Sequence, residues 1–175
     1  MTMTLIETKT LGTAAASIEF TSIPQTFTDL VVVISARTSA SATSEGLVLH
    51  LNGSSANFTS RFLYGNPPGG NAVSGTGGFT AGFVSGNNAT ANTFGSSNVY
   101  IPNYTGSTNK SFSVDAVSEH NAADAFQFIV AGLWSNTAAI TSLLVKPDSA
   151  NNLQAGSMIS LYGILKGSSN GVVVS

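Results

Sequence analysis

The stretch Phe27–Arg37, FTDLVVVISAR, decides the fold of this chain. It opens with the polar Thr28 and Asp29, continues with the aliphatic run Leu30–Ile34, and returns to polar residues. The run is too short for a membrane-spanning helix and too rich in β-branched residues for a surface helix. It is typical of a strand that is buried on both faces or lies at the centre of a sandwich sheet. We expect a second core strand of similar character over Phe126–Trp134.

The composition favours a single ordered domain. The chain has 175 residues, enough to bury roughly 70% of the surface of the unfolded chain. Only 8% of the residues are charged, whereas about 25% is usual, so its polarity comes from Ser, Thr, Asn and Gly. A disordered chain would contain few aromatic and β-branched residues, but this one has ten Phe, four Tyr, one Trp and many Val and Ile.

Short apolar or alternating segments between turn residues predict about ten strands. Leu47–Asn52 alternates, and Asn52-Gly53 predicts a tight turn with Phe58–Tyr64 as the return strand. We therefore expect an all-β fold, an antiparallel β-sandwich of jelly-roll or related Greek-key topology. The other expected strands are Met3–Leu11, Ala14–Phe20, Phe79–Val84, Asn98–Pro102, Ser111–Val117, Ile140–Val145 and Met158–Leu165.

The chain divides into three parts: an N-terminal arm or edge strand (1–13), a β-sandwich domain (14–166) and a C-terminal tail (167–175). Within the domain, Gly65–Ser97 is rich in Gly, Asn and Ser and has no charged residue, so we expect a loop insertion. Such a region can either lie against a neighbour without desolvating charge or form a mobile surface loop. Met1–Leu11 and the aliphatic Val172–Val174 are open to the same two interpretations, contact with another subunit or none.

The charge balance and the missing residue types exclude several partners. A net charge of −2 gives no basic face, so we expect no nucleic-acid binding. No apolar run approaches the roughly 20 residues of a membrane helix, so we expect no membrane partner. The absence of Cys removes disulfides and thiolate chemistry. Because no basic region precedes an apolar stretch at the N-terminus, we expect synthesis in the cytoplasm without a secretory signal.

We find no pattern that predicts a catalytic, cofactor-binding or metal site. His50 falls on the outward side of an alternating strand. The only cluster of acids with a histidine is Glu119-His120 with Asp124, close to Ser118, but a catalytic triad is defined by geometry and requires an oxyanion hole. Acids at every second position, which a calcium loop would show, and a phosphate-binding Gly-rich motif are both missing. We therefore expect a non-enzymatic protein without a cofactor or metal.

Three segments resemble a family of small virion proteins of tailed bacteriophages. They share an IPQT-(F/Y)-T-D-L entry to a hydrophobic strand, an NG…N-(F/Y) hairpin and a closing GS-x-(I/F)-S-L-Y-G-I. The resemblance covers roughly a third of the chain and includes no active-site residue; the region Gly65–Ser97 matches no such pattern. The segments are Phe20–Arg37 (FTSIPQTFTDLVVVISAR), Leu51–Gly65 (LNGSSANFTSRFLYG) and Ile140–Leu165 (ITSLLVKPDSANNLQAGSMISLYGIL).

The resemblance implies a β-sandwich component of the virion. It is consistent with a capsid decoration (cement) protein on the particle surface that binds the major capsid protein, and a homotrimer suits a three-fold position on a shell. The alternative that it leaves open is a tail or fibre module that binds a host receptor or glycan. Sugars commonly stack on aromatic rings, and the candidates for that role are Tyr64, Tyr100, Tyr104 and Trp134, although Trp134 ends an apolar strand and suits the core.

Overall fold

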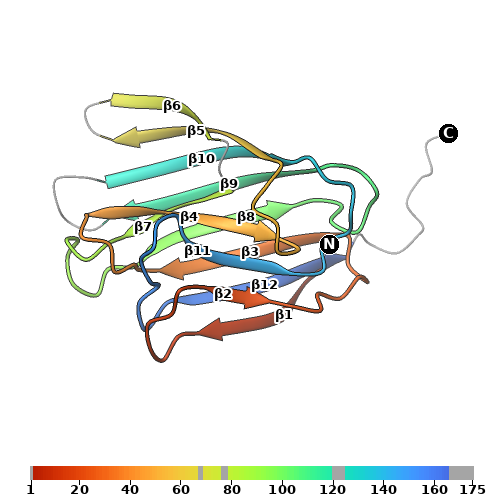
Figure 1. Ribbon diagram of the computed structural model, residues 1–175, viewed down its shortest axis with the longest axis horizontal. Helices are drawn as coiled ribbons and strands as arrows, with labels where there is room; N and C mark the ends of the chain where they lie inside the picture. The colour runs from red at the N-terminus through yellow and green to blue at the C-terminus, as the bar shows by residue number, and fades with distance from the viewer. Residues whose placement is uncertain (1, 67–68, 76–78, 120–124, 166–175) are drawn as a thin grey trace.

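The computed structural model describes residues 2–66, 69–75, 79–119 and 125–165, which contain twelve β-strands and no helix. The strands form two antiparallel sheets packed face to face (Figure 1), which confirms the predicted antiparallel β-sandwich. The larger sheet has eight strands in the order β1-β12-β3-β8-β9-β10-β5-β6, and the smaller has four in the order β2-β11-β4-β7. The strands are β1 (Thr2–Thr10), β2 (Ile18–Phe20), β3 (Asp29–Ala36), β4 (Ser44–Leu51), β5 (Phe58–Asn66), β6 (Gly69–Gly75), β7 (Phe79–Ser85), β8 (Gly95–Ile101), β9 (Lys110–Glu119), β10 (Ala125–Trp134), β11 (Leu143–Pro147) and β12 (Met158–Leu165).

The strand pairing follows a nested scheme. β1 pairs with β12, β2 with β11, β3 with β8 and β4 with β7, so the chain resembles one long hairpin rolled into two layers. This wrapping of eight strands is the jelly-roll arrangement. Two further strand pairs are inserted into it: β5 and β6 between β4 and β7, and β9 and β10 between β8 and β11. The inserted strands widen only the larger sheet, and Figure 1 shows β10, β5 and β6 beyond the edge formed by β7.

Strand β3 lies inside the larger sheet, as the sequence predicted. β12 and β8 flank it, and Leu30, Val32 and Ile34 are fully buried against the smaller sheet. On its other face Val31 is only 7% exposed, because its cross-strand neighbours are Tyr162 and Tyr100. On the outer face of this run Val31 is therefore covered, whereas Val33 is only partly buried.

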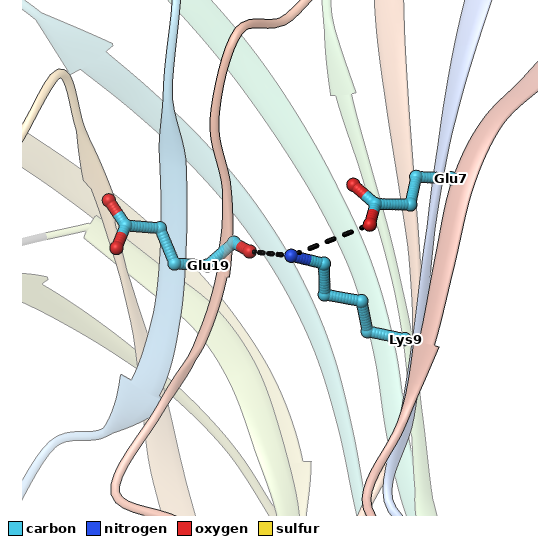
Figure 2. Close-up of polar contacts among 3 residues, drawn as sticks. All are labelled: Glu7, Lys9 and Glu19. Atoms are coloured by element: carbon cyan, nitrogen blue, oxygen red, sulfur yellow. Dashed lines mark hydrogen bonds and ion pairs between the residues drawn. The ribbon is translucent and has the colours of Figure 1, made fainter.

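Lys9 links the edges of the two sheets on the side where β1 and β2 lie. Its ammonium group donates a hydrogen bond to the backbone carbonyl of Glu19 at 2.6 Å and forms an ion pair with Glu7 at 3.5 Å (Figure 2). The same group lies 5.3 Å from the centre of the Phe20 ring, within the range of a cation–π interaction. The N-terminal segment is thus an edge strand held to the sandwich, and a bulge between Leu5 and Glu7 makes its outer edge irregular.

Two local predictions were wrong. The Asn52-Gly53 turn forms, with φ of 51° and 70°, and Ser54 donates its N–H to Leu51 at 2.9 Å. However, β5 is not the partner of β4: both sides of β4 are already occupied, by β11 and β7, so the chain crosses to the larger sheet and pairs with β10. In the region 65–97 the expected strand Phe79–Val84 forms as β7, but the rest is not only loop, because it also contains β6 and the start of β8. The tail 167–175 lies outside the described residues.

The second predicted core strand is buried on one face only. In β10, Phe128, Val130 and Trp134 are buried between the sheets, but Ile129 on the opposite face is 59% exposed. The apolar character of Phe126–Trp134 therefore does not reflect burial on both faces in this chain, in contrast to β3.

A substitution at Gly82 in β7 tests how closely the two sheets pack. Its φ is +102°, and a Cβ atom there would lie 2.4 Å from the Cβ of Ala116 in β9. We expect Gly82→Ala to reduce the free energy of unfolding by about 3 kcal/mol, through backbone strain and overpacking. Gly12, which has open space around it, is the matched control: Gly12→Ala should change stability by less than about 0.5 kcal/mol. Urea unfolding measures both, and equal midpoints would contradict this packing.

Candidate functional site

The acid–histidine cluster of the sequence, Glu119-His120 with Asp124, is only partly within the described residues. His50 is on the outward face of the smaller sheet opposite Leu144, and burial together with the nearby Lys146 lowers its pKa. Ser118 points into the sandwich and is fully buried, whereas its neighbour Glu119 is on the exposed face of β9. His120 and Asp124 lie outside the described residues. In the part of the chain that is described, no three His, Asp or Glu side chains are placed to hold a metal ion.

Two buried cations are satisfied by backbone carbonyl groups. The guanidinium of Arg37 donates to the carbonyls of four residues in the loop between β7 and β8, and its side chain is only 5% exposed. The ammonium group of Lys110 donates to Gly106 at 2.6 Å, to Thr108, and to Thr137 at 3.4 Å. Burial lowers the pKa of Lys110. Both residues hold loops at the ends of the sandwich in place. The carbonyls that Arg37 contacts belong to Asn87, Ala89, Thr90 and Thr93.

Glu45 is the most buried carboxylate of the smaller sheet. Burial raises the pKa of Glu45, but hydrogen bonds from Ser149, Asn151 and Thr38 together lower it by more. The pKa is therefore below its ordinary value. The Asn151 amide lies 3.0 Å from Oε1, and the Ser149 hydroxyl contacts the same oxygen. This group ties β4 to the loop that follows β11.

An aromatic groove lies where the wide sheet projects past the narrow one. Phe83 of β7 stacks on Phe128 of β10, with ring centres 4.3 Å apart and planes at 8°, and Tyr64 of β5 stacks on the same Phe128 at 5.4 Å. β7 is the edge strand of the smaller sheet on this side, so Phe128 beneath it is buried, whereas the rings of Phe62, Tyr64 and Phe126 beyond it are only partly buried. The groove encloses a cavity of about 230 Å³, lined by Ser44, Phe62, Tyr64, Phe83, Phe126 and Phe128.

The four aromatic residues proposed for sugar stacking have different environments. Tyr64 lines the aromatic groove. Tyr100 is 37% exposed on the outer face of the larger sheet, where its hydroxyl donates to Asp29 at 2.9 Å. Tyr104 is fully buried, with its hydroxyl bound to the carbonyl of Pro24, and Trp134 is buried against Phe58. Tyr104 and Trp134 are therefore core residues, and only the first two can contact a ligand.

The outer face of the larger sheet is the second candidate surface, and single residues in the sequence did not identify it. Exposed charge on it is limited, in the described residues, to Arg61, Asp115 and Glu119 on the strands β5 and β9. An open hollow of about 440 Å³ lies over β5 and β10 beside Arg61. Seven of the eight large apolar side chains that are exposed in the described part of the chain point outward from this sheet: Met3, Leu5, Leu63, Tyr100, Val117, Ile129 and Met158.

Comparisons with protein-family models, with curated proteins and with solved structures gave no match. The described residues contain no helix of the length and hydrophobicity that crossing a membrane requires. The two surfaces above are thus the features of this chain from which its function has to be inferred.

Glu45 predicts how stability depends on pH. Its pKa is lower in the folded chain than the ordinary value of 4.5, so its ionised form stabilises the fold above about pH 4.5. This contribution is lost as the pH falls through the pKa of the folded state. We expect Glu45→Gln to be less stable than the parent chain at pH 7 and to lose less stability between pH 5 and about pH 3. Thermal unfolding at a series of pH values measures the difference; parallel curves would show that Glu45 does not contribute.

Proposed function

We propose that this chain is a non-enzymatic structural protein of a phage virion, a capsid decoration (cement) protein. It binds the shell formed by the major capsid protein and stabilises it from the particle surface, after synthesis in the host cytoplasm. The observation that carries the proposal is the resemblance of three segments to small virion proteins. In the structure, these segments supply β3 and β12 at the centre of the jelly roll, together with β5 and β11.

Two further features support a structural role. The jelly roll is an architecture that viral capsid domains use, although lectins and cupins use it as well. The outer face of the larger sheet is broad, poor in charge and partly apolar, and such a face can be buried against a protein with little desolvation cost. Neither feature favours a nucleic acid or a membrane as the partner. A homotrimer matches the proposed position on a three-fold axis of the shell.

Purified particles test the location. We expect quantitative mass spectrometry to find the protein in the virion at a copy number comparable with that of the major capsid protein. Particles that lack it should lose their genome at a lower temperature than complete particles, and adding the purified protein back should restore the difference. Absence from particles would refute a virion role, and a few copies per particle would place the protein in the tail.

The alternative is a tail or fibre module that binds a host glycan, and the aromatic groove is the observation that favours it. Half-exposed rings can stack on the apolar face of a sugar, while the hydroxyl groups of Tyr64 and Ser44 supply hydrogen bonds. A sugar ring fits the cavity of about 230 Å³ only in part, so the rest of the glycan would extend into solvent.

A glycan array with the purified chain tests this alternative. If the groove binds sugar, Tyr64→Ala should weaken binding at least about tenfold, since stacking on one ring contributes on the order of 1 kcal/mol and its hydroxyl contributes a further hydrogen bond. Tyr100→Ala, which removes an exposed tyrosine outside the groove, is the matched control and should bind as the parent chain does. No binding above background by the parent chain would remove the glycan function.

A further inference from the structure

Three neighbouring strands, β9, β10 and β5, carry a cluster of exposed residues on the outer face of the larger sheet. Leu63 of β5, Ile129 of β10 and Asp115 of β9 lie opposite one another in one cross-strand row. The next row along the strands contains Arg61 and Ala131, with Ser113 completing it. Leu63 is 60% exposed and Ile129 59%, so two adjacent aliphatic side chains of the native fold face solvent together. We call Leu63, Ile129, Asp115, Arg61 and Ala131 the central patch.

The two charges of the central patch lack a partner among the described residues. Arg61 and Asp115 are both exposed, and the described residues offer neither a hydrogen bond nor an ion pair to either side chain. They are two strands and two residues apart, which corresponds to roughly 12 Å between their Cα atoms. The aliphatic pair and the small Ala131 separate them. Opposite charges thus stand on either side of an exposed apolar centre.

We propose that copies of this chain associate through the central patch, with Arg61 of each copy beside Asp115 of the neighbouring copy. A symmetry axis that runs over β10 between Ile129 and Ala131 relates the positions of the two charges. Rotation about it brings each Arg61 to the Asp115 of the next copy and gathers the Ile129 side chains at the axis. The contact is isologous, because each copy presents the same patch to the other, so it closes with two copies; a trimer would require a heterologous contact between two different patches.

The size and chemistry of the face suit this partner. The part of the face centred on β10, with two strands on either side, is about 24 Å wide and about 23 Å long, which gives roughly 550 Å² per copy and an interface at the low end of the stable range. The hollow beside Arg61 lies over Ala131 and Gly132, so small side chains leave room for a neighbour. A second copy supplies both the apolar surface and the opposite charge that the patch requires, and it is available wherever the chain is produced.

The proposal goes beyond the virion role and stands without it, because it concerns the purified chain alone. The test uses multi-angle light scattering and sedimentation velocity on the complete chain. We expect a dimer for the parent chain. Arg61→Glu and Asp115→Lys should each weaken association about tenfold or more, since each places like charges together. The chain with both changes should recover association, because the two charges have exchanged places.

Two variants complete the design. Ile129→Lys introduces a charge at the axis and should give a monomer that still unfolds cooperatively, since Ile129 is not part of the core and its cross-strand neighbour Asp115 carries the opposite charge. His50→Asp changes the outward face of the smaller sheet and should associate as the parent chain does. A parent chain that is monomeric at about 100 μM overturns the proposal, because its association would then be weaker than about −5.5 kcal/mol. The proposal is also overturned if the chain with both charge changes does not recover association. That result would also be expected if this face binds a shell protein instead of a second copy.

Discussion

The unequal width of the two sheets is the constraint on which the rest of the structure depends. A sandwich buries its core only where both sheets are present, and here four strands stand opposite eight. Among the nested strands, each sheet covers the inner face of the other. These strands are β1 to β4, β7, β8, β11 and β12. The inserted strands β10, β5 and β6 have a covered face only as far as β7 reaches, and aromatic rings fill the step between the layers. The aromatic groove lies on the inner side of these inserted strands, and the outer face of the larger sheet continues over their other side.

How much of this the sequence predicted depended on the local pattern. β12 occupies the predicted residues, and β9 shows the predicted alternation because one face meets the core and the other meets solvent. The partners of the strands were not predictable, since an Asn-Gly turn specifies a change of direction but not which sheet receives the next strand. β10 was misread because an apolar run looks the same whether its second face is covered by the same chain, by another molecule, or by nothing. Ile129 in this strand is therefore the clearest case in which the sequence predicted burial and the structure shows exposure.

The chain has few charged residues, and two of its cations are buried. Arg37 and Lys110 are buried without a carboxylate partner, and carbonyl oxygens of loops satisfy them instead. This arrangement orders the backbone at the ends of the sandwich, where no ladder of strands can do so. It also leaves most of the outer face of the larger sheet uncharged. A sequence gives no direct sign of such sites, because a buried Arg and a surface Arg differ only in their surroundings after folding.

The pairing of β1 with β12 has a consequence for how the chain folds. The first and the last strands of the jelly roll are neighbours, and β3 acquires one of its two partners only when β12 has been made. On a ribosome, the N-terminal half therefore waits for nearly the whole chain before its hydrogen bonds can be completed. Contacts between residues so distant in sequence make folding slow, on the order of milliseconds to seconds for β-sandwiches. During that time the edges of β3 and the apolar outer face of β10 are available to other chains, so folding and assembly compete for the same surfaces.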